Sequence, residues 1–262
     1  MTFPEYETII TRISARHLFI ILNRPEKRNA LNDTMVAELN DVFAKSVSEK
    51  QIRTISIQGS GKAFCSGADL EYLKKIKNYD KQTNLNDSLK LSELFLRIYR
   101  LPKPVIAIVH GPALAGGCGL ASVCDFIIAT HEAKFGYPEV KIGFIAALVS
   151  VFLIRQIGER KARDLLLSGR IISAHEAFQM GMINRVVPDS DLKTQIDGLI
   201  NDLTLNSPMS LTASKKLLDS FSFTDIEEEL KAKAQINAEF RQTSDFQEGL
   251  SAFFEKRKPN WD

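Results

Sequence analysis

Two glycine-containing stretches of the sequence have the features of backbone anion sites. The first is Lys62–Leu70, in which Asp69 is placed to cap a following helix. The second is Gly111–Gly119, whose glycines let other groups approach the backbone closely. Because a helix is expected to begin in each stretch, the amides near Ala68 and Gly116 would lack partners within the helix. Two such amides directed at one oxygen form an oxyanion hole, whereas the same residues also suit two tight turns without a ligand.

A third stretch, Phe135–Gly143, carries an acid that could transfer protons. Glu139 stands just ahead of an uncharged run from Gly143 to Ile154. A carboxyl group held against apolar walls has a raised pKa, which suits a proton donor and acceptor near neutral pH. The alternative is a surface glutamate paired with Lys141. Taken alone, these residues leave both interpretations open.

The composition limits the partners and metals that the chain can use. The 34 Lys and Arg against 32 Asp and Glu leave a net charge of +2, which gives no support for nucleic acid or an anionic membrane as a partner. Cys65, Cys118 and Cys124 contain no C-x-x-C pair, and the histidines show no metal-ligand spacing. The sequence therefore predicts no disulfide framework and no metal site. Free cysteines suit a reducing compartment, and with no secretory signal visible in Met1–Thr8 we expect a cytoplasmic protein.

One uncharged stretch, Pro104–Cys124, is long enough to cross a bilayer. Its prolines and glycines would interrupt a helix exposed to lipid and leave backbone groups without partners. We therefore expect a buried strand, a turn and the start of a helix rich in small residues.

The elements that position these stretches are strands separated by helices. A helix from Asn32 or Asp33 to about Glu49 is expected to bury a face that includes Met35, Leu39, Val42 and Val47. Strands are predicted at Tyr6–Ser14, His17–Leu22, Arg53–Gln58, Val105–Val109 and Phe126–Thr130. Alternating strands and helices favour parallel pairing and an α/β fold.

The last third of the chain changes in character and is predicted to be helical. Helices are expected at Ala174–Gly181, Asp191–Leu205, Met209–Phe221, Asp225–Arg241 and Asp245–Glu255. We therefore divide the chain into an α/β core, residues 1–190, and a helical region, residues 191–262.

In order and spacing, these stretches resemble the enoyl-CoA hydratase/isomerase (crotonase) superfamily over nearly the whole chain. The similar segments are Ile21–Pro25 with Asn29–Asn32, Ala63–Leu70, Pro104–Asp125, Phe135–Gly143, Ser168–Ile183 and Phe253–Pro259. The resemblance implies a spiral of ββα units with a C-terminal helical trimerisation region. It also implies a homo-oligomer, as a trimer or hexamer, and no cofactor, because CoA is part of the substrate.

The same resemblance assigns functions to individual residues. The amides of Ala68 and Gly116 would bind the carbonyl oxygen of an acyl-CoA thioester, and Glu139 would transfer protons or activate water. Further residues are expected to contact substrate or CoA: Lys27, Arg28, Ala63, Leu70, Gly117, Phe253 and Lys256.

One departure from the family pattern affects the reaction. Two-glutamate hydratases carry a second acid immediately after the Gly-Gly-Cys step, and this sequence has Gly119 there. Single-acid relatives include Δ3,Δ2-enoyl-CoA isomerases and sequences similar to 3-methylglutaconyl-CoA hydratases of leucine and acyclic terpene breakdown. The resemblance is closer to the second group, so we expect hydration of a short or branched enoyl-CoA. An isomerase, and a CoA-ester-binding protein without catalysis, are the alternatives.

Overall fold

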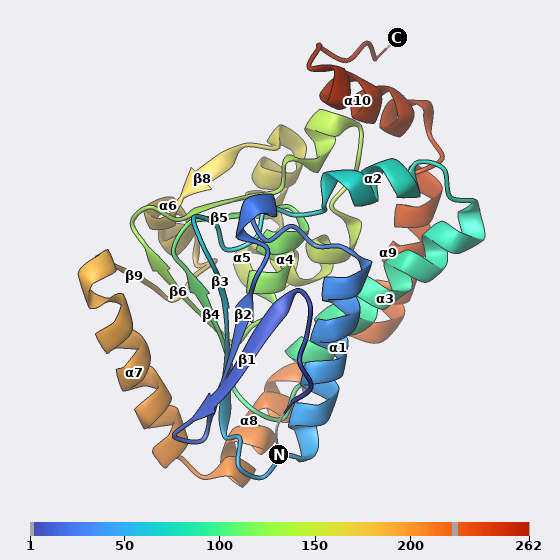
Figure 1. Ribbon diagram of the computed structural model, residues 1–262. Helices are drawn as coiled ribbons and strands as arrows, with labels where there is room; N and C mark the ends of the chain where they lie inside the picture. The colour runs from blue at the N-terminus through green and yellow to red at the C-terminus, as the bar shows by residue number, and fades with distance from the viewer. Residues whose placement is uncertain (1–2, 222–224, 262) are drawn as a thin grey trace.

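A computed structural model describes residues 3–221 and 225–261 (Figure 1). Within these residues, one sheet has six strands in the order β1-β2-β3-β4-β6-β9, and a second has three in the order β5-β7-β8. The strands are β1 (Ile9–Ser14), β2 (His17–Leu22), β3 (Thr54–Gly59), β4 (Val105–Val109), β5 (Pro112–Leu114), β6 (Phe126–Thr130), β7 (Lys134–Gly136), β8 (Ile171–Ser173) and β9 (Arg185–Val187). The predicted α/β class is confirmed.

Helices surround both sheets and supply most of the C-terminal part of the chain. The α-helices are α1 (Asp33–Ser48), α2 (Leu70–Ile76), α3 (Lys81–Tyr99), α4 (Gly116–Ser122), α5 (Ala147–Ser168), α6 (Ala174–Met180), α7 (Asp189–Leu205), α8 (Pro208–Ser220), α9 (Ile226–Phe240) and α10 (Ser244–Glu255). Two short 3₁₀ helices are η1 (Pro25–Lys27) and η2 (Pro138–Ile142).

From β4 to β7 the strands alternate between the two sheets. β4 and β6 lie side by side in the large sheet, while β5 and β7, which follow them, pair in the small sheet. The pair β4 and β5 leads into α4, and the pair β6 and β7 leads into η2 and α5. The predicted spiral of ββα units is confirmed by this arrangement.

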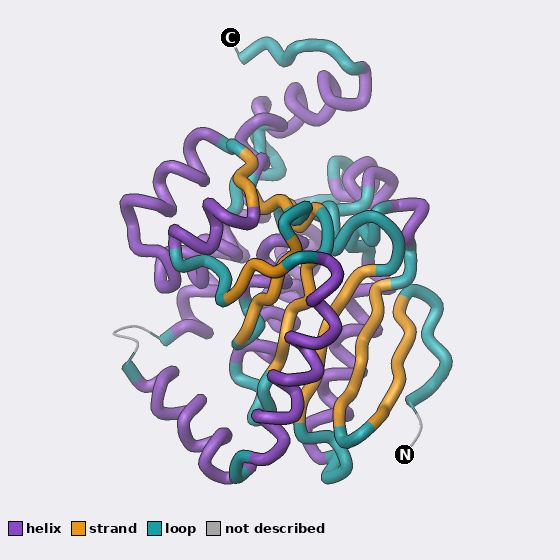
Figure 2. Tube along the Cα trace, turned by 90° about the vertical axis from the view of Figure 1, so that its left-hand side faces the viewer, coloured by secondary structure: helices purple, strands orange, loops and turns teal. Residues whose placement is uncertain are grey.

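The centre of the large sheet is buried on both faces. In β4, Ile106 and Ile108 pack with residues of α7, whereas Val105, Ala107 and Val109 belong to the main core on the other face. Successive side chains of a strand point to opposite faces, so an uninterrupted apolar run predicts this two-sided burial. Figures 1 and 2 show α7 along one face of the sheet and α1 on the opposite side.

The first hairpin matches the prediction at its turn but begins later. Ala15 and Arg16 both have positive φ, 46° and 67°, as a two-residue turn with right-handed strand twist requires. The strand β1 starts at Ile9 rather than Tyr6 because the Glu38 carboxylate accepts hydrogen bonds from the amides of Glu7 and Thr8. These amides are therefore unavailable for strand pairing.

Helix α1 confirms its predicted cap and corrects its predicted face. The Asn32 side chain accepts a hydrogen bond from the amide of Met35 and caps the helix. Val47 is wrongly assigned to the buried face, since it is 44% exposed. It lies about a third of a turn away from the Met35 row, and Ser46 takes the buried place and donates to the Phe43 carbonyl at 2.8 Å.

The C-terminal helices are present as predicted, and they contact different parts of the molecule. α9 lies against α3 and α5, and its residues Ile226, Leu230 and Ala234 belong to the main core. α10 lies at the end of the molecule, against η2 (Figures 1 and 2). A division at residue 190, and a role for the helical region in trimerisation, stay predictions.

The uncharged stretch Pro104–Cys124 forms β4, β5 and α4, in agreement with the expected strand, turn and helix. Over residues 3–221 and 225–261, no helix combines the length and the apolar character needed to cross a membrane.

Candidate active site

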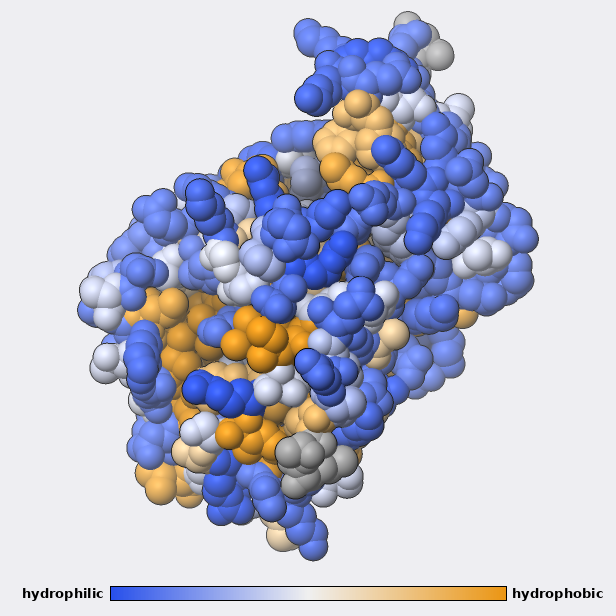
Figure 3. Space-filling model, in the orientation of Figure 1, coloured by the Kyte–Doolittle hydropathy of each residue, from blue (hydrophilic) through white to orange (hydrophobic). Residues whose placement is uncertain are grey.

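A cavity of about 720 Å³ brings together the three stretches singled out in the sequence. A cavity of this size is typical of small-molecule sites. Its lining contains these predicted site residues: Ala68, Leu70, Gly116, Glu139 and Phe253. Figure 3 shows apolar surface between α2 and α10. Of the residues that line the cavity, Leu70 and Phe253 are about half exposed. The cavity thus has an apolar opening and a buried acid inside.

The first loop directs the Ala68 amide away from its neighbouring chain segment. Leu31 donates to the Gly67 carbonyl at 2.7 Å and accepts from the Asp69 amide at 2.8 Å, as in a parallel bridge. Alternate residues of an extended chain point in opposite directions, so the Ala68 amide points to the side opposite Leu31. Because Ala68 itself lines the cavity, this amide is available to a ligand there.

Asp69 holds this loop at the start of α2. Its carboxylate accepts from the amides of Glu71 and Tyr72, which confirms the predicted cap. Arg24 pairs with the same carboxylate at 2.8 Å. Burial raises the pKa of Asp69, but the hydrogen bonds from Arg24 and from the helix amides outweigh it, so the pKa is lowered overall. The anionic cap fixes where the helix begins.

The second loop places the Gly116 amide at the start of another helix. Ala115 precedes α4 with a φ of 50°, and its amide donates to the Gly136 carbonyl at 2.9 Å. As the first residue of α4, Gly116 has an amide with no partner inside the helix. A Cβ atom on Gly67 would lie 3.8 Å from the Gly116 nitrogen, so the two loops are in contact.

Glu139 lies in η2, in the wall of the same cavity. It is 8% exposed, and Oε2 is buried without a hydrogen-bond partner among the described residues. Burial raises the pKa of the Glu139 carboxyl to about 7, although its own backbone amide acts in the opposite direction. The interpretation as a surface glutamate is wrong. A carboxyl group with this pKa can both accept and donate a proton near neutral pH.

The segment that carries Glu139 is held by α10. A Cβ atom on Gly249 would lie 2.4 Å from the carbonyl of Ile142, and one on Gly143 would lie 2.0 Å from the carbonyl of Asp245. These distances leave room only for glycine, so α10 and η2 touch through their backbones. The sequence alone does not reveal this contact, because the two segments are about a hundred residues apart.

Gly119 faces the cavity wall at the place where two-glutamate relatives carry an acid. A Cβ atom on Gly119 would lie 2.2 Å from Cγ1 of Val149 and 3.2 Å from Cζ of Phe95. Both of these side chains line the cavity. Apolar side chains therefore occupy the space that a second acid would need.

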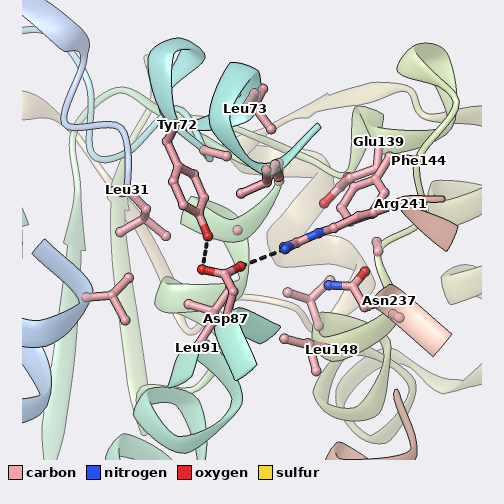
Figure 4. Close-up of a pocket in the computed structure, with 18 of the residues that line it drawn as sticks. Leu31, Tyr72, Leu73, Asp87, Leu91, Glu139, Phe144, Leu148, Asn237 and Arg241 are labelled. Carbon is pink, nitrogen blue, oxygen red and sulfur yellow. Dashed lines mark hydrogen bonds and ion pairs between the residues drawn. The ribbon is translucent and has the colours of Figure 1, made fainter. Parts of the chain in front are cut away.

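The cavity also holds a polar cluster that the sequence analysis missed. Tyr72 of α2 and Arg241, which follows α9, both contact the carboxylate of Asp87 in α3 (Figure 4). Polar residues within helices usually indicate solvent-exposed faces, so their pattern gave no signal of burial.

The other predicted contacts lie outside the cavity lining. Lys27 is exposed and pairs with Glu71 at 3.0 Å, and Arg28 and Lys256 have left-handed backbones at helix ends. Ala63 is buried, and its carbonyl accepts from the Asn29 side chain at 2.9 Å. Gly117 packs against Cys65. Contact of these residues with substrate or CoA stays a prediction.

Asp125 and His17 have partners typical of structural residues. The Asp125 carboxylate accepts from the Val105 amide at 2.8 Å and from Lys215 at 2.6 Å. His17 is buried between the hydroxyls of Thr54 and Ser56. Across the part of the chain that the structure describes, no group of three His, Cys, Asp or Glu is arranged to hold a metal ion.

Comparisons with known proteins agree with the fold and with the motifs. The family model described as enoyl-CoA hydratase/isomerase matches residues 13–262. A Thermus thermophilus protein that carries an enoyl-CoA hydratase name is 41% identical over 253 residues, covering 96% of this chain and all of that protein. The 2,3-dehydroadipyl-CoA hydratase of Escherichia coli is 34% identical, covering 97% of this chain and 98% of its own. The crotonyl-CoA hydratase of Syntrophomonas wolfei is 32% identical, covering 98% of each.

Solved structures give the same result. The enoyl-CoA hydratase/isomerase of Pseudoalteromonas atlantica superimposes with a TM-score of 0.87 at 29% identity, covering 98% of this chain and 100% of that one. The enoyl-CoA hydratase of Mycobacterium smegmatis gives 0.80 at 32% identity, covering 97% and 99%. The chain therefore belongs to the enoyl-CoA hydratase/isomerase family and is an enzyme of that family.

Proposed function

We propose that this enzyme adds water across the 2,3-double bond of a short or branched enoyl-CoA thioester. The amides of Ala68 and Gly116 bind the thioester oxygen, and Glu139 transfers the proton. The observation that carries the proposal is the common cavity, in which a buried acid with an unpartnered oxygen lies with the two loops.

The chemistry requires charge to accumulate on the thioester oxygen. When the oxygen of water bonds to the β-carbon, the π electrons move through the α-carbon and form an enolate. Two fixed amides stabilise this negative charge without reorganising, and loss of one such donor costs about 3–4 kcal/mol in other enzymes.

A single carboxyl group suffices if it acts twice. Glu139 as a carboxylate takes one proton from the attacking water, and the remaining hydroxyl bonds to the β-carbon. The protonated Glu139 then gives that proton to the α-carbon, which collapses the enolate and restores the carboxylate. A pKa of about 7 suits both steps near neutral pH.

A specific observation also favours a second candidate, a Δ3,Δ2-enoyl-CoA isomerase. Val149 and Phe95 fill the space beside Gly119. A second acid therefore has no room there, and Glu139 alone would have to activate water and protonate the α-carbon. In an isomerase, Glu139 would remove a proton from the α-carbon of a 3-enoyl thioester. It would then return that proton to the γ-carbon while the double bond moves to the 2,3-position.

Product analysis of the purified enzyme separates these reactions. Crotonyl-CoA and 3-hexenoyl-CoA are incubated separately, and the thioesters are resolved by chromatography and mass. Hydration predicts 3-hydroxybutyryl-CoA from the first. Isomerisation predicts 2-hexenoyl-CoA from the second, with no hydrated product from either. CoA-ester binding by calorimetry with neither product would support a catalytically inactive binding protein and overturn the proposal.

The acyl group, the assembly and the location belong to the same proposal. The motif similarity favours 3-methylglutaconyl-CoA as one substrate, and we propose that CoA enters as part of the substrate, without a further cofactor. Exposed apolar side chains of the α8 segment, among them Met209, Leu218 and Phe221, support a homo-oligomer, as a trimer or hexamer. The three free cysteines support a reducing, cytoplasmic location.

A further inference from the structure

The polar cluster in the cavity wall joins three helical segments that are far apart in the sequence. Tyr72 donates its hydroxyl hydrogen bond to one oxygen of Asp87, and Arg241 Nη1 donates to the other at 2.7 Å. Figure 4 shows these three side chains directed toward one another, and Glu139 lines the same cavity. Arg241 is only 4% exposed, so this is a buried cation in a site that is otherwise largely apolar.

Arg241 uses only part of its hydrogen-bonding capacity. Nη1 donates to Asp87 and to Asn84 Oδ1, the latter at 3.1 Å, whereas Nε is buried and has no partner among the described residues. A guanidinium group carries five N–H donors, and buried donors are normally satisfied. Arg241 therefore has a donor available for a ligand in the cavity that it lines.

A second unsatisfied side chain lies one helical turn earlier. Asn237 is 5% exposed and donates through Nδ2 to Ser88 Oγ at 3.3 Å, while its Oδ1 has no partner in the described chain. Rotating the amide by 180° would let the Ser88 hydroxyl donate to Oδ1 and would turn Nδ2 toward the cavity. Asn237 can thus add a second donor beside Arg241.

These donors are not hydrogen-bonded to Glu139, whose Oε2 has no partner among the described residues. The thioester oxygen belongs at Ala68 and Gly116, and the reacting carbons belong at Glu139. The rest of an acyl chain is left with the apolar lining, including Leu73 and Leu148, and with the polar cluster. A chain that ends in a methyl group would leave the buried donors unpaired, which is unfavourable.

We propose that Arg241, assisted by Asn237, binds a carboxylate at the far end of the acyl chain, so that the substrate is the CoA monothioester of an unsaturated dicarboxylic acid. This inference rests on the proposed function and narrows its substrate class. A guanidinium edge matches a carboxylate with paired, charge-assisted hydrogen bonds, which favours a carboxylate over a hydroxyl group. Both oxygens of Asp87 already accept hydrogen bonds, so Asp87 does not need the remaining donors.

Two thioesters of equal chain length test the proposal. The kcat/KM for hydration is measured with 2,3-dehydroadipyl-CoA, which ends in a carboxylate, and with 2-hexenoyl-CoA, which ends in a methyl group. We expect the wild-type enzyme to prefer the carboxylate substrate by about tenfold or more. Arg241→Met should remove this preference, because it should lower kcat/KM for 2,3-dehydroadipyl-CoA and leave kcat/KM for 2-hexenoyl-CoA unchanged. An equal or greater wild-type kcat/KM for 2-hexenoyl-CoA, or an equal loss for both substrates in Arg241→Met, would overturn the inference.

Control variants separate recognition from folding. Arg163→Met removes an exposed arginine that pairs with Glu159 on its own helix, and it should leave the preference unchanged. Arg241→Lys keeps the charge but loses the paired donors, so it should retain part of the preference. If Arg241→Met fails to fold, the proposal is tested by the ratio of the two kcat/KM values in the wild type and in Arg241→Lys. A wild-type preference for the carboxylate substrate that is smaller in Arg241→Lys would support it, and an unchanged ratio would overturn it.

Binding measurements keep this inference distinct from the proposed reaction. Calorimetry with the saturated thioesters adipyl-CoA and hexanoyl-CoA requires no turnover. Tighter binding of adipyl-CoA that Arg241→Lys weakens, without hydration of any enoyl-CoA, would uphold the carboxylate site and reject the proposed function. Hydration of 2-hexenoyl-CoA together with equal binding of the two saturated thioesters would uphold the proposed reaction and reject the carboxylate site.

Discussion

Gly119 and Val149 are so close that a single methyl group cannot be added between them. A Cβ atom on Gly119 would lie 2.2 Å from Cγ1 of Val149. Both residues are buried, and their helices, α4 and α5, are in contact. The absence of an acid at this position is thus accompanied by tight apolar packing, and Glu139 lines the same cavity as Ala68 and Gly116.

This packing predicts that Gly119→Ala destabilises the enzyme by roughly 1–3 kcal/mol, because the core must shift to accept the methyl group. Chemical denaturation measures the free energy of unfolding. Combining the change with Val149→Ala should recover part of the loss, which a double-mutant cycle detects as coupling. Gly198→Ala in α7 is the control: its Cβ would have open space, so stability should rise by up to about 1 kcal/mol. Equal stability of Gly119→Ala and wild type would contradict the close packing.

The contact between α10 and η2 predicts an effect on catalysis from outside the cavity. Gly249→Ala places a methyl group 2.4 Å from the Ile142 carbonyl and should displace the segment that carries Glu139. A displacement of about 1 Å can lower a rate by about a hundredfold, so we expect kcat to fall much more than KM changes. The control is Glu255→Ala on the same helix, which removes an exposed side chain and should leave kcat unchanged. An unaltered kcat in Gly249→Ala would show that α10 does not position Glu139.

The buried carboxyl of Glu139 predicts a pH-dependent stability difference. Its pKa is raised from 4.5 to about 7, so between these values the native state holds a proton that the unfolded state has released. The contribution of Glu139 to stability is therefore fully present below about pH 4.5 and is lost as the pH rises through 7. Glu139→Gln remains neutral, so its stability relative to wild type should increase over this range by up to about 3 kcal/mol. Unfolding curves at pH 5 and pH 8 measure the change, and a constant difference would contradict the burial of the charge.

Much of the fold follows from local patterns in the sequence. The strands β4 and β6 have the predicted bounds because their residues are apolar without interruption and turn residues border them. The caps Asn32 and Asp69 are correct because a side-chain oxygen at a helix start satisfies nearby amides wherever the helix packs. The short strands β5, β7 and β8 were not predicted, since three residues show no periodicity and their pairing is with distant segments.

The residues of the candidate site also fall into two groups, those that the sequence singles out and those that only the structure brings together. Ala68, Gly116 and Glu139 belong to contiguous motifs, so the sequence alone singles them out, and all three line one cavity. Their catalytic roles stay predictions. Arg241 and Asp87 meet only through the packing of α3 against the end of α9, at a separation of 154 residues. Each alone is a polar residue in or beside a helix, and nothing in its neighbours predicts that the two meet in the wall of a cavity.

Replacing Glu139 by glutamine tests the central claim most directly. The kcat for hydration of crotonyl-CoA is compared for wild type, Glu139→Gln and the control Glu132→Gln, which alters an exposed residue. If Glu139 transfers the proton, kcat in Glu139→Gln falls by about 10² to 10⁴-fold, while Glu132→Gln matches wild type. A folded Glu139→Gln enzyme with the wild-type kcat would contradict the account.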